Sequence, residues 1–157
     1  MSELKQLIEG MRSCSVCERL PLGPKPIFQL GGSARILIVG QAPGRVTHHK
    51  GVPFDDPSGE RLRAWLGVTR VEFYDPDKFA IFPMGLCYPG TGKGGDMPPR
   101  RECAAHWRHP VLAAMPKIEL TITLGKYAHD WYLGDRQGKA LSETVASWRA
   151  FWPQILP

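Results

Sequence analysis

The sequence has no long apolar run, and its N-terminus has no apolar block. No stretch approaches the roughly 20 apolar residues that a membrane-spanning helix requires. The opening segment, MSELKQLIEGMRSCSVC, mixes charged and apolar side chains and lacks the hydrophobic centre of a secretory signal. We therefore expect a soluble, cytoplasmic protein whose cysteines are reduced or metal-bound.

The sequence also lacks internal repeats, low-complexity tracts and the two commonest phosphate-binding fingerprints. The turn at 40–44 is followed by no Gly-Lys-Ser/Thr at Walker spacing, and it contains no G-x-G-x-x-G. Neither a Walker loop nor a Rossmann dinucleotide site is therefore expected.

What is present is the composition of one globular domain, which we expect to span residues 1–157. Of the 157 residues, 43% are apolar and 22% are charged, as is typical of a chain with a packed core. Lysine and arginine exceed aspartate and glutamate by 20 − 15 = +5. This modest excess is compatible with a polyanionic partner, because neutralising phosphates contributes affinity for nucleic acid that does not depend on sequence.

Three apolar segments, each followed by a turn and a helical pattern, predict the fold. The first, ILIV at 36–39, is apolar without alternation, as expected of a strand that is covered on both faces. This order predicts an α/β protein, a three-layer α/β/α sandwich with a central, mostly parallel four-stranded sheet whose last strand is incomplete. The predicted strands are 35–39, 78–84 and 118–125, and the predicted helices are 4–9, 58–66, 100–115, 126–133 and 141–152. Ligands of such sheets bind beyond the carboxyl ends of the strands, here at 40–56, 83–99 and 125 onward.

Several local features accompany this prediction. We expect Ser58 to cap a helix whose buried face holds Leu62, Trp65 and Leu66, and Gly67 to end it. We expect the helix at 100–115 to bury Trp107, Val111 and Met115, with Pro110 kinking it. Residues 88–99 predict a mobile loop with Lys93 at its tip.

The turn at 40–44 presents its backbone to a ligand. Gly40 and Gly44 permit positive φ and let a ligand approach without a Cβ in the way, while Pro43 stiffens the turn. Such turns are also common as purely structural elements of α/β units, so this one is suggestive only together with its surroundings.

GQAPG, then the residues from Gly44 to Gly51, then VPF, resembles the first motif of the uracil-DNA glycosylase superfamily. The resemblance is closest to the iron–sulfur branch, which carries a Gly-Glu-Ala-Pro-Gly turn, an acidic stretch and then Pro-Phe. It extends over nearly the whole chain, because LCYPG after the second strand and the LG at 124–125 fall in matching order. It implies a monofunctional, monomeric DNA repair glycosylase that removes a damaged or deaminated base from DNA with water.

The resemblance also implies a base-binding site, since a base must be flipped out of the stack before it can be cut from its sugar. Phe54 matches the stacking aromatic, although it also reads as a core residue. The backbone N–H groups of the turn would bind base oxygens and stabilise charge on the leaving base. The implied substrate-binding residues are Gly40, Gln41, Ala42, Pro43, Gly44, Phe54, Pro83 and Met84.

Two departures from the family pattern affect the chemistry. Where the iron–sulfur branch has acidic residues, this chain has Thr47, His48 and His49. We hypothesise that His48, or else His49, positions the water or supports the charges of the transition state, with phosphate contact as the alternative. Pro83 replaces the asparagine that reads uracil, so Gln41 or the backbone compensates, another damaged base is preferred, or excision is weak.

The four cysteines, Cys14, Cys17, Cys87 and Cys103, include one C-x2-C pair. Four thiolates suit either a tetrahedral zinc ion or a [4Fe–4S] cluster, and the resemblance implies a structural cluster. The alternative is a C-x2-C pair plus two unrelated buried thiols. The other metal-like pair, His106 and His109, is interpreted as facing solvent or DNA.

The DNA contacts are predicted from charge. Lys93, Arg100, Arg101 and Lys126 are candidate phosphate contacts, with a solvated surface as the alternative. The superfamily's second motif, a His-Pro-Ser loop, is not found before the sequence ends at FWPQILP, so we expect a truncated chain or one lacking that half of the site. A non-catalytic nucleic-acid-binding module and a small-molecule nucleotide hydrolase are the two rival functions.

Overall fold

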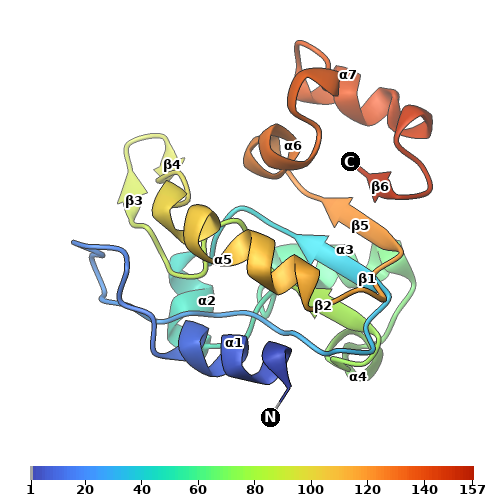
Figure 1. Ribbon diagram of the computed structural model, residues 1–157. Coiled ribbons are helices and arrows are strands. Elements are labelled where there is room, and N and C mark those ends of the chain that lie inside the picture. Colours follow the sequence, from blue (N-terminus) through green and yellow to red (C-terminus); the bar gives the residue numbers. More distant parts are fainter. Residues whose placement is uncertain (1) are drawn as a thin grey trace.

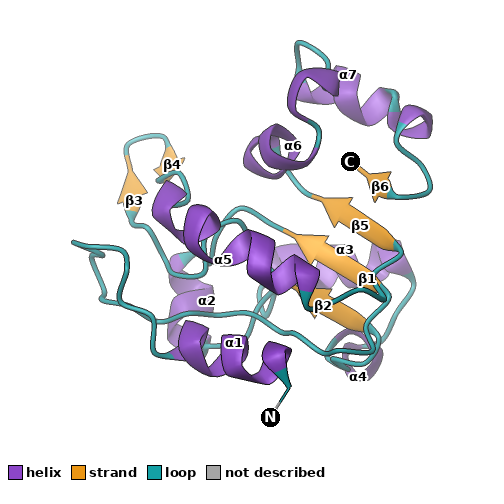
Figure 2. Ribbon diagram, in the orientation of Figure 1, coloured by secondary structure: helices purple, strands orange, loops and turns teal. Residues whose placement is uncertain are grey.

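The computed structural model describes residues 2–157 and contains the predicted parallel sheet. Its strands are β1 (Ile36–Val39), β2 (Phe79–Ile81), β5 (Leu120–Thr123) and β6 (Ile155–Leu156), in the order β2-β1-β5-β6. Every neighbouring pair is parallel, with Leu37 opposite Ala80 on one side and Thr121 on the other. Figures 1 and 2 show the sheet at the centre with helices around it. The α/β/α prediction and the four-stranded parallel sheet are confirmed.

Helices cover both faces of the sheet because β1 and β2 are apolar on both sides. In Figure 1, α1 (Glu3–Arg12) and α5 (Arg101–Ala113) lie in front of the sheet, and α3 (Pro57–Leu66) and α4 (Arg70–Phe73) lie behind it. The front core gathers buried side chains such as Leu37 and Val39 against Met11 and Val111. The rear core packs Ile38 against α3 and α4.

The remaining elements follow the strands of the sheet. After β1 and β2 come α2 (Arg45–Lys50) and a hairpin of β3 (Thr91–Gly92) and β4 (Gly95–Asp96). After β5 come α6 (Lys126–Tyr132), α7 (Leu141–Ala146) and two 3₁₀ turns (Gly134–Arg136, Trp148–Ala150). The helices of the described chain, residues 2–157, are all too short or too polar to cross a lipid bilayer.

Several local expectations need correction. The cap of α3 is Asp56 rather than Ser58, because its carboxylate accepts from Gly59 N. Trp65 is 76% exposed rather than packed in the core. The predicted loop at 88–99 contains the β3–β4 hairpin, with Lys93 in its turn, and the helix predicted at 141–152 breaks at Ser147.

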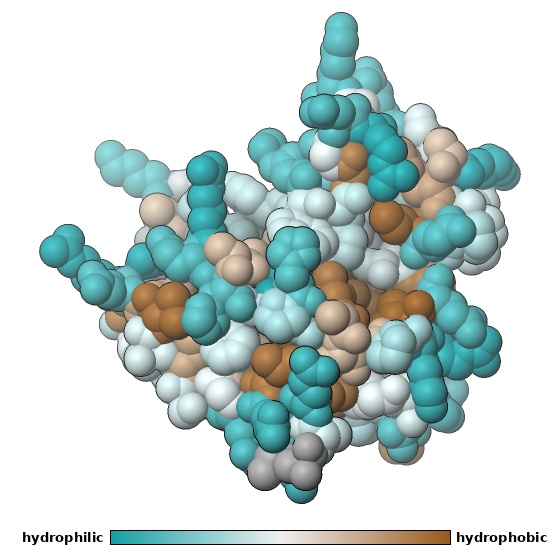
Figure 3. All heavy atoms as spheres, in the orientation of Figure 1, coloured by the Kyte–Doolittle hydropathy of each residue, from teal (hydrophilic) through white to brown (hydrophobic). Residues whose placement is uncertain are grey.

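Polar side chains face outward on the side of α1 and α5. On the face drawn in Figure 3, hydrophilic residues predominate and apolar ones gather in separate patches between them. Two of the exposed polar residues on α5 are His106 and His109, whose rings lie against Trp107 and Trp131. Neither histidine lines the cavity that the four cysteines share.

Candidate functional site

A cavity of about 340 Å³ opens at the carboxyl end of β1 and β2. The turn after β1, the segment around Phe54, one side of α3 and the ends of β2 and β5 form its wall. This is the edge at which ligands of parallel sheets bind. Its lining residues are Ile27, Gly40, Gln41, Ala42, Pro43, Gly44, Thr47, Pro53, Phe54, Asp56, Ser58, Arg61, Leu62, Trp65, Ile81, Pro83 and Leu124.

The 40–44 turn is tied to the segment after β2. Met84 N donates to Gly40 O at 2.9 Å, and Gly85 N donates to Gln41 O at 3.0 Å. The expected positive φ is wrong: Gly44 has φ −79°, and Gly40 is not among the glycines with positive φ. Gly40 is small for another reason, since a Cβ there would lie 3.3 Å from Phe54 Cζ. The turn and the Phe54 ring are therefore direct neighbours.

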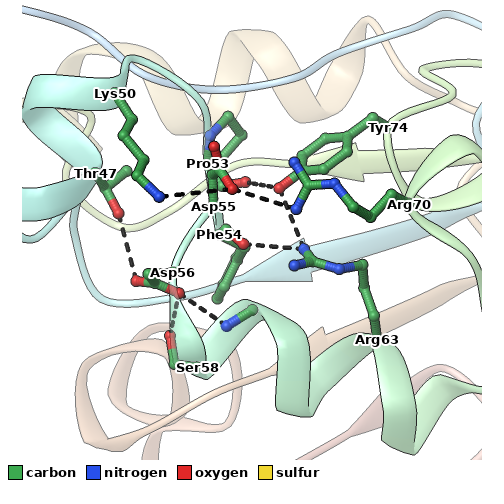
Figure 4. A network of polar contacts seen from close by, with 11 residues as sticks. Thr47, Lys50, Pro53, Phe54, Asp55, Asp56, Ser58, Arg63, Arg70 and Tyr74 are labelled. Atoms are coloured by element: carbon green, nitrogen blue, oxygen red, sulfur yellow. Dashed lines mark hydrogen bonds and ion pairs between the residues drawn. The ribbon is translucent and has the colours of Figure 1, made fainter.

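Phe54 is held in an unusual backbone conformation by its surroundings. Its φ of 59° lies in the left-handed region, which a bulky residue rarely adopts. Arg63 Nη1 donates to Phe54 O at 2.9 Å and to Tyr74 Oη at 3.2 Å, and Tyr74 Oη donates to Pro53 O at 2.7 Å. Figure 4 shows these contacts converging on the backbone at 53–54. The half-buried ring lines the cavity on one side and meets Phe73 edge-on at a centroid distance of 6.1 Å.

The buried Arg63 has aromatic rings rather than a carboxylate around its guanidinium. Its Cζ lies 5.2 Å from the Phe73 centroid and 5.5 Å from the Tyr74 centroid. Burial raises the pKa of Tyr74, and the neighbouring Arg63 and Arg70 oppose that rise. The guanidinium, the phenol and the backbone at 53–54 thus form one connected hydrogen-bonded unit.

Asp56 is the one carboxylate among the cavity-lining residues. Its Oδ1 accepts from Gly59 N at 2.8 Å and from Ser58 Oγ at 2.7 Å, and its Oδ2 faces Thr47 Oγ1 at 3.5 Å. Its neighbour Asp55 instead pairs with Arg70 at 3.2 Å. These hydrogen bonds fix the Asp56 carboxylate at the edge of the cavity, where it can orient a water molecule.

His48 and His49 do not line the cavity. Both lie on α2, where His48 is buried and His49 is exposed, while Thr47 is the residue that faces inward. The His48 ring lies 6.1 Å from the Tyr88 ring, and its Nδ1 is buried with no partner among residues 2–157. Burial lowers the pKa of His48, and the charges of Lys25 and His49 lower it further. Neither imidazole therefore lies on the wall of the cavity.

Pro83 and Met84, which follow β2, line two different hollows. Pro83 lines the cavity, so no side-chain amide stands at this point of the wall, whereas Met84 lines a separate groove. The buried Arg108 holds the segment by donating to Phe82 O at 2.7 Å and Pro83 O at 2.9 Å. Its Cζ lies 4.2 Å from the Phe82 ring, and burial lowers the pKa of this guanidinium.

The groove beside the cavity is basic and aromatic. It measures about 460 Å³ and lies between α5 and α6, and Arg100, Arg101 and Lys126 line it together with Tyr127 and Trp131. Lys126 pairs with Asp130 at 3.0 Å. Arg100 donates to Glu18 O and Arg19 O, which anchors the N-terminal segment. Lys93 lies apart from this group, in the hairpin turn.

The four cysteines line one small cavity, and none forms a disulfide. Cys14 and Cys17 follow α1, Cys87 follows β2, and Cys103 lies in the first turn of α5. Two N–H groups point at sulfur: Trp107 Nε1 to Cys14 at 3.2 Å, and Leu86 N to Cys103 at 3.3 Å.

Burial raises the pKa of three of these thiols, Cys17, Cys87 and Cys103. Burial raises the pKa of Cys103 to about 12, and burial followed by the charge of Glu102 raises the pKa of Cys17. No group of three or more His, Cys, Asp or Glu side chains within residues 2–157 is placed to hold a metal ion. The four cysteines share one cavity, and their role as ligands stays a prediction.

The fold and the site together define an α/β domain with a cavity at the carboxyl edge of its parallel sheet. A family model for the uracil DNA glycosylase superfamily matches residues 28–157. The chain therefore belongs to this superfamily.

Sequence reasoning found the 40–44 turn, Phe54 and Pro83 on the cavity wall, but it missed the contribution of α3. Ser58 was predicted as the cap of this helix, and Leu62, Trp65 and Leu66 were assigned to its buried face. DDPSG carried a usable signal, because an aspartate followed by proline is a typical helix start. Among the polar lining residues, Asp56 and Arg61 were missed, and Thr47 and Ser58 were named without a role in the site.

Proposed function

We propose that this protein excises uracil or a related deaminated base from DNA by hydrolysis, without a covalent enzyme intermediate. Membership of the superfamily supports DNA as the partner. The observation that carries the proposal is that the 40–44 turn and the Phe54 ring line one cavity at the ligand-binding edge of the sheet. A base swung out of the DNA stack is a planar ligand of the kind that such a wall accommodates.

The turn offers hydrogen-bond donors to this base. Among residues 2–157, the backbone N–H groups of Gln41, Ala42 and Gly44 have no acceptor. Free N–H groups aimed at a base oxygen would stabilise the negative charge that develops as the glycosidic bond breaks. The Phe54 ring stacks on one face of the base, and the fixed backbone at this residue keeps the ring in place.

Asp56 is our candidate for orienting the attacking water, in place of His48. Its carboxylate lines the cavity, and its hydrogen bonds hold it still, whereas the His48 ring is buried away from the cavity wall. Asp56→Asn is a sharp test because asparagine also caps helices well, so the fold is retained. We expect single-turnover excision to fall by about 100-fold or more, and His48→Gln to leave it nearly unchanged. The reverse pattern would return the role to His48.

The function is tested with oligonucleotides that contain uracil, hypoxanthine or xanthine, followed by alkaline cleavage of abasic sites. We expect one of these bases to be released, and Phe54→Ala to weaken its binding by about 5- to 100-fold through lost stacking. Phe28→Ala, a half-buried phenylalanine outside the cavity, is the matched control. Release of none of the bases, with activity on free nucleotides instead, would favour the nucleotide hydrolase.

One observation favours a non-catalytic nucleic-acid-binding module as the second candidate. Pro83 occupies the wall at the end of β2 and provides no amide to read a base edge. If damaged DNA is bound in preference to undamaged DNA but no abasic site forms in a single turnover, this candidate replaces the glycosylase.

The basic groove would carry the DNA backbone away from the cavity. Arg101 and Lys126 are exposed there, and adjacent residues, Pro83 and Met84, separate the two hollows. Replacing either cation by glutamine should weaken binding of all DNA sequences alike and reduce its salt dependence. Arg100 is committed to backbone carbonyls, so its loss should reduce stability as well.

We also propose that the four cysteines bind a structural [4Fe–4S] cluster. Four thiols around one cavity, with N–H donors to two sulfurs, fit the donor set of such a cluster. A tetrahedral zinc ion held by the same four thiols is the alternative. Iron and sulfide in anaerobically purified protein, lost in Cys103→Ser with a fall in stability, are the expected results. Stoichiometric zinc, or a metal-free protein of full stability, would contradict the cluster.

A further inference from the structure

Four side chains of α3 at helical spacing line the cavity. They are Ser58, Arg61, Leu62 and Trp65, at positions i, i+3, i+4 and i+7. Leu62 is 6% exposed and anchors the helix on the rear core. Arg61 and Trp65, one turn apart, are exposed and continue the cavity wall outward.

Trp65 has no partner that explains its position. It is 76% exposed, whereas Trp152, the other strongly exposed tryptophan, is 49% exposed and meets Trp148 edge-on. Within residues 2–157, no aromatic ring or guanidinium stacks on Trp65. Tryptophan is usually highly buried because of its large apolar area, so a free indole at a cavity mouth indicates a surface that a ligand covers.

The Arg61 side chain also has no partner within the described residues. The neighbouring cations are used within the fold: Arg63 holds Phe54 O, and Arg70 pairs with Asp55. In the described chain, Arg61 forms neither a hydrogen bond nor an ion pair. A free guanidinium beside a free indole matches a ligand that carries both an anionic group and a planar ring, as a nucleotide does.

We propose that Arg61 and Trp65 bind the nucleotide next to the flipped-out one, with the indole stacked on its base and the guanidinium at its phosphate. The inference rests on the proposed function, because the cavity has to hold the target base for this neighbour to reach α3. Stacking on an unpaired neighbour favours single-stranded or locally opened DNA. In intact duplex the neighbouring base is already stacked within the helix.

The test is a double-mutant cycle that combines the Trp65→Ala change with removal of the neighbouring base. The measured quantity is the dissociation constant of the protein for labelled single-stranded DNA. The target nucleotide carries 2′-fluorine to slow excision, and each flanking base in turn is present or replaced by an abasic analogue. We expect Trp65→Ala to weaken binding by about 5- to 100-fold when the base is present, and to have no effect when it is absent. Trp65→Phe should retain part of the affinity, and Trp152→Ala should change nothing.

Arg61 is tested through salt dependence. Arg61→Gln should lower the slope of log affinity against log salt by about 0.7, the value for one phosphate of a single strand. An unchanged slope would remove the phosphate contact. An equal loss in Trp65→Ala with and without the flanking base would overturn the stacking.

Two further readouts separate this inference from the proposed function. If Phe54→Ala leaves the preference for damaged over undamaged targets unchanged, the base pocket is wrong, and the Trp65 cycle still reports whether a strand is stacked at α3. If Trp65→Ala instead changes the sedimentation of the free protein, the indole lies at an interface between copies of the chain and the inference is wrong.

Discussion

Replacing Gly59 by alanine tests whether Phe54 is held by the first turn of α3. A Cβ at position 59 would lie 1.7 Å from Phe54 O, 2.6 Å from Phe54 C and 2.8 Å from Phe54 Cβ. The first two are backbone atoms, so the clash cannot be relieved by turning a flexible side chain. The contact must lengthen to at least 3.0 Å, which displaces either α3 or the 53–54 backbone.

The magnitude follows from three opposing effects. Alanine is favoured over glycine inside a helix by about 1 kcal/mol. Overpacking costs about 1–3 kcal/mol, and losing the hydrogen bond from Arg63 to Phe54 O costs about 1.5–3 kcal/mol. We therefore expect Gly59→Ala to lower the free energy of unfolding by about 1.5–5 kcal/mol. We also expect a loss of base binding comparable to that of Phe54→Ala, because the ring moves with its backbone.

The assay is urea denaturation together with binding of the damaged oligonucleotide. Ala64→Gly, at an exposed position of the same helix, is the matched control. It should cost about 1 kcal/mol through helix propensity alone and leave binding unchanged. If Gly59→Ala is as stable as the parent and binds DNA equally well, the first turn of α3 does not position Phe54.

Two further predictions concern the surroundings of the site. Tyr74→Phe should lower the free energy of unfolding by about 1–3 kcal/mol, because Pro53 O and Arg63 both lose a partner; an unchanged urea midpoint would show that the hydroxyl contributes nothing. His48 should make the fold less stable in mild acid. Its pKa is lower in the folded protein than in the unfolded chain, so the unfolded chain binds more protons than the folded protein as the pH falls from about 6.5 toward the folded value. His48→Gln should reduce the loss of stability between pH 7.5 and 5.5, and the exposed His106→Gln should not; equal pH profiles for parent and His48→Gln would contradict the assignment.

The sheet could be predicted because its strands are apolar on both faces. Burial on both sides of β1 removes the alternation that an exposed sheet face requires, and the turns and helices between strands then favour parallel pairing. The fourth strand, Ile155–Leu156, lies slightly before the point expected for it. The cysteines could also be predicted to converge, but only through the resemblance, because no spacing places Cys87 beside Cys14.

The wall of the cavity was harder to predict, because helical periodicity shows which side chains share a face but not what that face meets. Trp65 follows Leu62 by three residues and was assigned to the same core on that basis. In the structure, both residues line the cavity, but Leu62 is buried in the rear core and Trp65 is exposed to solvent. His48 shows the opposite error, since a titratable residue near the predicted site turned into the protein interior.

The least predictable feature is the backbone of Phe54, which no local propensity favours. A bulky residue at positive φ costs about 1–3 kcal/mol, and such conformations persist only when the surroundings determine them several times over. Here Arg63, Tyr74 and the close approach of Gly59 each constrain the same two peptide units. These contacts exist without DNA, so the ring needs no ordering when a base arrives. The strain at Phe54 therefore supports the proposed stacking surface, which would be formed before a base binds.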